Sequence, residues 1–213
     1  MDRLQRNALA LWPGLAAQMG VPVAGWDATV LARRADGRAR MIVLRLDGHG
    51  QSLAMKHQAA PCNAEGFATQ MQAQMDAAGA LPGGVPALRA VDLDAQACVM
   101  DFAHGVPLSV ALDQADEESH ADLLAQAGAW LDRWHRATLE GARLFQPHFT
   151  LNYLRHIIQE VRSGQRAVSE PARCVACAET LLALEPTFAG HRTQAARTHG
   201  DLHMRNLLMG PRV

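Results

Sequence analysis

The sequence predicts an α+β fold, with an antiparallel sheet in its first half and mostly helices in its second. Strand-like runs of alternating apolar residues lie between residues 28 and 57, separated by the turn-forming pairs Asp36-Gly37 and Asp47-Gly48. From Leu108 onward, apolar residues recur at helical spacing. With 213 residues, 49% of them hydrophobic and 19% charged, the chain is long enough to bury one core or two small lobes.

The first 102 residues contain the predicted sheet. Residues 2–19 have helical spacing, but Trp12-Pro13-Gly14 predicts a short helix, a break and a second short turn. A longer helix is expected over residues 63–79, because Phe67, Met71 and Met75 recur every four residues and Gly79 is a suitable stop. The predicted strands cover residues 28–34, 39–46, 52–57, 88–93 and 97–102.

The second half is predicted to be helical, with helices over residues 122–139, 149–162 and 170–184. The first of these has an apolar face that includes Trp130 and Trp134. Acidic residues cluster before it, and two interpretations stay open: a solvated helix cap, or a surface that attracts a polycationic substrate. The cluster consists of Asp113, Asp116, Glu117, Glu118 and Asp122.

Chemistry is concentrated near the end of the chain, in the stretch from Thr198 to Met209. A turn carries the carboxylate of Asp201, the amide of Asn206 follows five residues later, and Leu207-Leu208-Met209 can be buried as an anchoring strand. Phosphoryl transfer needs a group that orients the acceptor hydroxyl and oxygen ligands for the magnesium on the nucleotide phosphates. Asp201 suits the first role and Asn206 the second.

His199-Gly200-Asp201 followed by Asn206 resembles the catalytic loop of the aminoglycoside phosphotransferase and choline kinase families. The resemblance implies a two-lobed protein-kinase-like fold. Residues 1–102 would form the nucleotide-binding lobe, and residues 103–213 a helical lobe with the catalytic loop. It also implies a structural role for His199, and ATP and Mg²⁺ as cofactors.

The resemblance assigns further nucleotide-binding residues in the first lobe. Lys56 is the only lysine among twenty basic side chains, and it lies at the end of the third predicted strand. There the family carries the lysine that contacts the α and β phosphates, with a glutamate of the following helix as its partner. Glu65 is the only glutamate available for that role, although it lies early in the helix and Gln70 or Gln74 is an alternative for the family position. Asp101 and Ala103 occupy the segment whose backbone would bind the base. The first hairpin turn contains a single glycine, Gly37, which predicts a short or unconventional phosphate lid.

One expected residue is missing from the sequence. Members of the resembled family carry a magnesium-binding Asp after the catalytic loop, and no Asp follows Asn206 here. We expect the sequence to be a fragment of a longer protein whose helical lobe is incomplete. The alternative is a nucleotide-binding pseudoenzyme or regulatory module.

The spacing of cysteine and histidine residues suggests a third and less favoured alternative, a zinc-stabilised helical module. Cys174 and Cys177 are separated by two residues, and His199 and His203 by three, which are zinc-ligand spacings. The gap between the two pairs is wider than in the usual zinc finger. We therefore expect these cysteines, like Cys62 and Cys98, to be metal-free thiols rather than ligands or disulfides.

Charge and hydropathy limit the partners. The net charge of −1 provides no overall field for nucleic acid or an anionic membrane, and no stretch of 18 apolar residues or export signal is present. We expect a cytoplasmic protein with no nucleic acid or membrane partner. Its substrate would be a small molecule with a hydroxyl acceptor, such as an aminoglycoside, a choline-like alcohol or a sugar.

Overall fold

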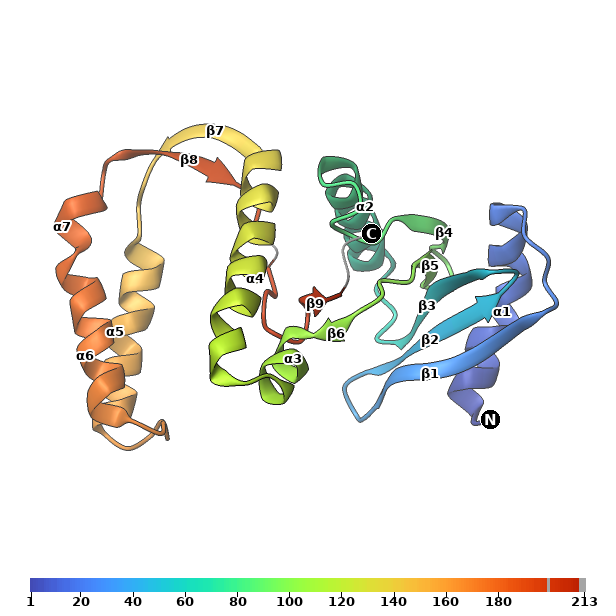
Figure 1. Cartoon of the computed structure of the whole chain (residues 1–213), viewed down its shortest axis with the longest axis horizontal. Helices are drawn as coiled ribbons and strands as arrows, with labels where there is room; N and C mark the ends of the chain where they lie inside the picture. Colours follow the sequence, from blue (N-terminus) through green and yellow to red (C-terminus); the bar gives the residue numbers. More distant parts are fainter. Residues whose placement is uncertain (199, 211–213) are drawn as a thin grey trace. The chain divides into compact units, whose positions relative to one another are not determined.

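The computed structural model describes residues 1–198 and 200–210 and divides the chain into two compact units (Figure 1). One unit contains Met1–Ala137 together with the residues that follow Thr198, and the other contains Thr138–Thr198. Each unit is defined by the contacts within it. The lobe boundary after residue 102 stays a prediction. Among the described residues, none of the helices combines the length and apolarity needed to cross a bilayer.

Helix α1, Arg3–Met19, is one uninterrupted helix. Asp2 caps its first turn by accepting a hydrogen bond from the N–H of Gln5, and Gly20, with φ of +68°, ends it in the left-handed conformation. The predicted break at Pro13 is wrong. Pro13 lies on the exposed face, while the buried stripe that includes Ala8, Trp12 and Leu15 continues past it, so packing outweighs the local cost of proline.

A five-stranded antiparallel sheet forms the centre of the first unit, in the order β1-β2-β3-β5-β4. The predicted α+β class is confirmed, and each predicted strand overlaps an observed one. The second hairpin turn, however, is His49-Gly50 rather than Asp47-Gly48, because both turn residues have positive φ, as a two-residue hairpin requires. The strands are β1 (Trp26–Ala35), β2 (Arg40–Gly48), β3 (Gln51–Ala60), β4 (Leu88–Asp92) and β5 (Ala97–Asp101).

The two faces of this sheet have different partners. Alternate residues such as Leu44, Leu46 and Met55 are buried with the apolar side of α1 in the main core. On the opposite face, α2 (Ala64–Ala80) packs over β4 and β5 through Phe67 and Met71. The same face of β2 and β3 is only partly buried. The sheet therefore keeps one covered face and one half-covered face.

Two helices complete the first unit, α3 (Leu108–Gln114) and α4 (Glu117–Ala137). Helix α4 begins five residues before the predicted start. The side chain of Ser119 lowers the pKa of the Asp116 carboxyl, and so does the N–H of Ser119, which donates to Asp116 Oδ1 at 2.9 Å. Glu117 and Glu118 lie in the first turn, so this part of the acidic cluster fits the helix-cap interpretation.

The second unit consists of two packed helices, a short third helix and a two-stranded sheet. Helices α5 (His148–Arg162) and α6 (Pro171–Ala183) pack together, and α7 (Glu185–Phe188) follows them. Strands β7 (Leu139–Leu144) and β8 (Arg192–Ala196) form an antiparallel pair and were not predicted. Every residue of β7 is exposed and no residue of β8 is fully buried, so neither strand has the buried apolar face that marks a strand in a sequence.

Candidate active site

The predicted catalytic loop brings Asp201 and Asn206 together. The side-chain amide of Asn206 donates hydrogen bonds to the carbonyl oxygen of Asp201 at 2.8 Å and to its Oδ2 at 3.2 Å. The N–H of Asn206 also donates to the carbonyl of His203 at 2.8 Å, which closes the loop. The side chain of Asp201 is 80% exposed, so a substrate hydroxyl can reach its carboxylate. His199, predicted to have a structural role, lies outside the described residues.

The side chain of Asn206 carries an amide oxygen of the kind that magnesium accepts as a ligand. Since the amide nitrogen of Asn206 faces Asp201, its Oδ1 is turned away from that carboxylate and is available to a cation. Mg²⁺ takes oxygen ligands and keeps several waters, with one or two protein groups and the phosphates completing its shell. The amide oxygen of Asn206 can supply one of these protein ligands, while the carboxylate of Asp201 is assigned to the acceptor hydroxyl.

A short two-stranded sheet anchors the loop to the segment that follows β5. Strand β9, Leu208–Met209, pairs with β6, Val106–Pro107. Directly beside this pair, the N–H of Leu108 donates to the carbonyl of Leu207 at 2.8 Å, and that of Ser109 to Met204 at 3.2 Å. The anchoring strand after Asn206 therefore forms over two residues, but it is not buried as predicted, because Leu208 is 44% exposed. It joins the predicted catalytic loop to the segment expected to bind the base.

Lys56 lies on β3, on the face of the sheet that does not carry α1. Its cross-strand neighbours are Val43 on β2 and Cys98 on β5, and directly opposite residues share one face of a sheet. Cys98 packs against Phe67 and Met71 of α2, and burial raises the pKa of its thiol to about 11. The lysine therefore lies at the edge of the area that α2 covers.

The expected partner of Lys56 does not meet it in this structure. Glu65 is exposed in the first turn of α2, where a carboxylate is favoured by the helix dipole, and no ion pair among the described residues joins it to Lys56. Gln74, further along the same helix, donates to the carbonyl of Pro86 at 2.6 Å. Pairing of Lys56 with Glu65 remains a prediction.

The segment after β5 contains Asp101 and Ala103. Asp101 ends the strand: its N–H donates to the carbonyl of Ala87 at 3.0 Å, and its Oδ1 accepts from Nε of Arg89 at 2.5 Å. Ala103 follows in the irregular segment before β6. The structure places both residues on the link between the sheet and the catalytic loop, and their contact with a base remains a prediction.

The turn between β1 and β2 is already filled by a carboxylate. Asp36 Oδ1 accepts hydrogen bonds from the N–H groups of Arg38 and Ala39, both at 2.8 Å, and Oδ2 accepts from Nε of Arg34 at 2.6 Å. These contacts, that of Arg34 foremost, lower the pKa of Asp36 to about 2. Two amides that could bind phosphate are thus bonded within the turn itself.

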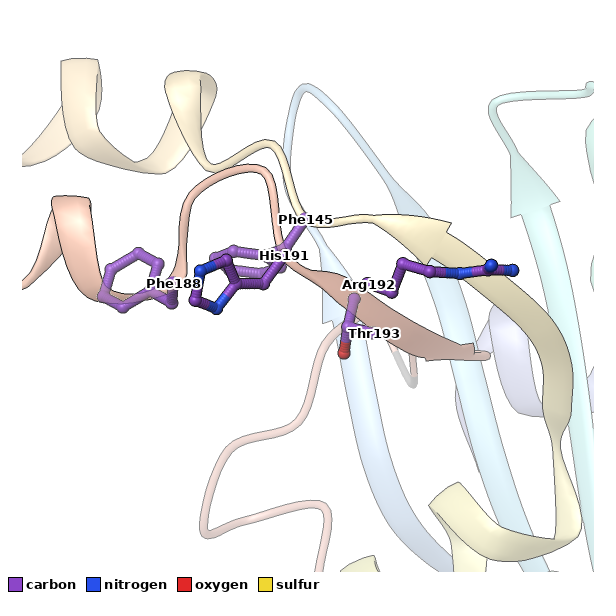
Figure 2. A pocket seen from close by; sticks show the side chains of 5 residues that line it. All are labelled: Phe145, Phe188, His191, Arg192 and Thr193. Carbon is purple, nitrogen blue, oxygen red and sulfur yellow. The ribbon is translucent and has the colours of Figure 1, made fainter.

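The second unit contains a separate apolar cavity of about 370 Å³ (Figure 2). Phe145 and Phe188 meet edge to face with ring centres 5.4 Å apart, and His191, Arg192 and Thr193 complete its lining. None of the predicted site residues lines it. Phe145 and Phe188 lie 43 residues apart in the sequence, so no periodic pattern predicts this cavity.

The metal alternative has no support among the described residues, which contain no cluster of three or more His, Cys, Asp or Glu side chains suited to a metal ion. Cys174 and Cys177 lie on α6 in the second unit and His203 in the first. All four cysteines are free thiols.

A sequence profile of the phosphotransferase enzyme family matches residues 21–213. The chain belongs to this family. The match includes both Lys56 and the catalytic loop, and it confirms the resemblance that the loop predicts. Among curated protein sequences, no significant match is found.

One similar solved structure is spectinomycin phosphotransferase, crystallised with ADP and spectinomycin. The two chains are 13% identical, and the alignment has a TM-score of 0.47. It covers 95% of this chain and 65% of the other, so this sequence spans about two thirds of the length of that protein.

Proposed function

We propose that this chain belongs to an enzyme that transfers the γ-phosphoryl group of ATP to a hydroxyl group of a small molecule. The observation that carries the proposal is the pairing of Asp201 with Asn206 on a loop anchored beside the base-binding segment. The family match supports the same reaction class. An aminoglycoside, a choline-like alcohol or a sugar remains the expected acceptor.

Each residue has a distinct task in the proposed reaction. The acceptor oxygen forms a bond to the γ-phosphorus while the bond to the β-γ bridging oxygen breaks, and Asp201 orients the hydroxyl and accepts its proton. Asn206 Oδ1 would hold Mg²⁺, which neutralises charge on the phosphates when bound. Lys56 would contact the α and β phosphates, and the backbone of Asp101 and Ala103 would contact the base.

The test is a transfer assay on the full-length protein with ATP, Mg²⁺ and a panel of aminoglycosides, choline and sugars. We expect a phosphorylated acceptor with the wild type and none with Asp201→Asn, whereas ATP affinity stays unchanged because Asp201 acts on the acceptor. Transfer by Asp201→Asn at the wild-type rate would contradict the assignment.

Two observations favour a second function, that of a nucleotide-binding pseudoenzyme. Asp36 occupies the amides of the first hairpin turn, and Glu65 does not pair with Lys56. Such a protein would bind ATP but transfer nothing to any acceptor, and the same assay with a binding titration distinguishes the two.

A further inference from the structure

Arg45 lies on the half-covered face of the sheet, beside the segment proposed to bind the base. Its neighbours on β2, Leu44 and Leu46, are buried in the core with α1, so Arg45 points to the opposite face. There its guanidinium carbon lies over the ring of Phe102, 4.5 Å from the ring centre. Phe102 stands between the two residues predicted to contact the base, Asp101 and Ala103.

Polar contacts hold this guanidinium in place. Its Nε lies 2.9 Å from Oδ1 and 2.8 Å from Oδ2 of Asp47, and its Nη2 lies 3.4 Å from the hydroxyl of Ser52. Ser52 in turn donates to Asp47 Oδ1 at 2.5 Å. These contacts restrain the rotation of a side chain that is still 36% exposed. The result is a planar cation fixed in position before any ligand binds.

The position of Arg45 relative to Lys56 matches the order of groups in a nucleotide. Lys56 pairs with Val43, whereas Arg45 pairs with Ala54, so the two basic residues lie in adjacent cross-strand rows on one face. Rows of one face are separated by two residues, or about 6.7 Å along a strand. A nucleotide whose phosphates meet Lys56 and whose base meets the segment after β5 must therefore pass Arg45.

We propose that the guanidinium of Arg45, backed by Phe102, is a stacking platform for the purine base of the nucleotide. This inference rests on the proposed function. A planar, delocalised, weakly hydrated guanidinium stacks on aromatic faces and on nucleic acid bases. Ala54, directly across from Arg45, has a small side chain that leaves space above the sheet for a base. Arg45 thereby adds a base contact beyond the hydrogen bonds of the backbone.

The experiment compares a ligand that has a base with one that lacks it. Binding of ATP with Mg²⁺ and of inorganic tripolyphosphate with Mg²⁺ is measured by calorimetry for the wild type and for Arg45→Leu. We expect Arg45→Leu to bind ATP about tenfold more weakly, which falls within the range of a cation–π contact. Tripolyphosphate affinity should not change, because Lys56 is intact. Arg45→Lys keeps the charge, loses the plane, and should also weaken ATP binding.

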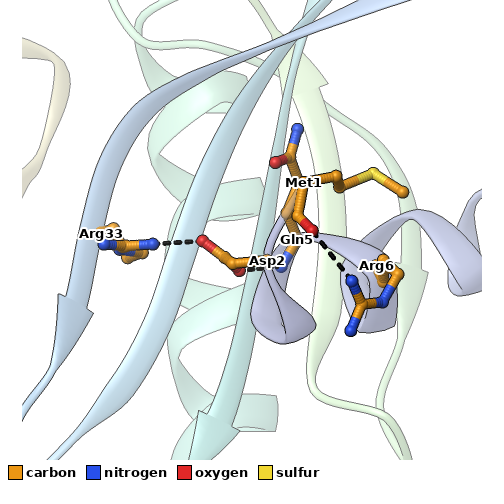
Figure 3. A network of polar contacts seen from close by, with 5 residues as sticks. All are labelled: Met1, Asp2, Gln5, Arg6 and Arg33. Carbon is orange, nitrogen blue, oxygen red and sulfur yellow. Dashed lines mark hydrogen bonds and ion pairs between the residues drawn. The ribbon is translucent and has the colours of Figure 1, made fainter.

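Arg33→Leu is the matched control. Arg33 lies on the same sheet but pairs with Ile42, a residue of the core face, and it forms an ion pair with Asp2 at the start of α1 (Figure 3). Its replacement removes one guanidinium from the opposite side of the sheet. We expect both ligands to bind Arg33→Leu as they bind the wild type.

Several outcomes would overturn the platform. Tighter ATP binding by Arg45→Leu would show that Arg45 blocks the base, and unchanged ATP binding by both Arg45 variants would show no contact. Equal losses for ATP and tripolyphosphate would indicate a structural role. In all three cases the wild type still binds ATP, so the proposed function survives. A wild type that binds neither ligand would overturn the proposed function and the platform together.

Discussion

A Cβ atom on Gly105 would lie 2.6 Å from the carbonyl oxygen of Met209. Gly105 has a φ of +143°, a conformation that other residues rarely adopt, and it lies where β6 and β9 bring the two segments together. This approach ties the segment after β5 to the strand that follows the catalytic loop. The two segments can therefore approach this closely only because residue 105 is a glycine.

Gly105→Ala should destabilise the protein by about 1–3 kcal/mol, because it adds both backbone strain and a clash with Met209. The free energy of unfolding in urea measures the effect. Gly128→Ala in α4 is the control: apart from its chain neighbours and the nearby helix backbone, nothing lies within 4 Å of its added Cβ, so a gain of about 0.5–1 kcal/mol is expected. Equal effects of the two substitutions would show that the β6–β9 approach carries no strain.

Pro13→Ala should stabilise the protein by about 1–2 kcal/mol. Proline costs about 3 kcal/mol relative to alanine inside a helix, and part of the gain is offset by the greater entropy of the unfolded alanine chain. Pro13 is exposed within α1, so no packing is lost. Urea unfolding measures the change. Pro171→Ala, at the first position of α6 where proline is favoured, should give no gain. A loss of stability in Pro13→Ala would contradict this account.

Sequence patterns predicted an element correctly where the burial of its side chains follows the same pattern. The strands of the large sheet were predictable because alternate residues face the buried core, and the pairing of Asp201 with Asn206 because these two residues lie only five positions apart. The break at Pro13 was wrong because a buried stripe spans it. The turn at His49-Gly50 was missed because Asp47-Gly48, a stronger local signal, is used inside β2, where Asp47 binds Arg45.

The rest of the candidate site depends on contacts that local patterns do not encode. Arg45 and Phe102 are 57 residues apart in sequence, and only the register of β2, β3 and β5 brings them together. Glu65 was chosen as the one glutamate of its helix, but the helix begins at Ala64, which places it in the exposed first turn. Alternation along β2 could have indicated only that Arg45 points away from the face of Leu44 and Leu46.

His57 should make stability depend on pH below about 6.5. Its side chain is buried on β3, its Nδ1 has no hydrogen-bond partner among the described residues, and burial lowers its pKa from the ordinary value of 6.5. As pH falls through that value, the unfolded chain binds a proton before the folded chain does. Stability is therefore full above pH 6.5 and declines below it, down to the lowered pKa of the folded state.

His57→Leu should remove this part of the pH dependence, since no proton is then bound in either state. The free energy of unfolding at pH 7.5, 6.5 and 5.5 tests the prediction. The wild type should lose stability over this range more steeply than His57→Leu. His135→Gln, an exposed change on α4, should follow the wild type. Parallel curves for wild type and His57→Leu would refute the role of burial.

Lys56 should be sensitive even to replacement by arginine. It lies between Val43 and Cys98 on one face of the sheet, and α2 covers Cys98 through Phe67 and Met71. The longer, planar guanidinium of Lys56→Arg cannot occupy the same point without displacing a phosphate or α2. We therefore expect Lys56→Arg to weaken ATP binding although the charge is kept, and Lys56→Met to weaken it further.

Binding of inorganic tripolyphosphate tests whether Lys56 contacts the phosphates, because this ligand has phosphates but no base. If Lys56 binds the α and β phosphates, Lys56→Met should lose affinity for tripolyphosphate as well as for ATP, in contrast to the Arg45→Leu pattern. Gln51→Met, at the exposed start of β3, should bind both ligands as the wild type does. If Lys56 is only a solvated strand residue, both of its variants should stay within about 0.5 kcal/mol of the wild type in stability and bind both ligands normally. That result would leave the phosphotransferase proposal resting on Asp201 and Asn206.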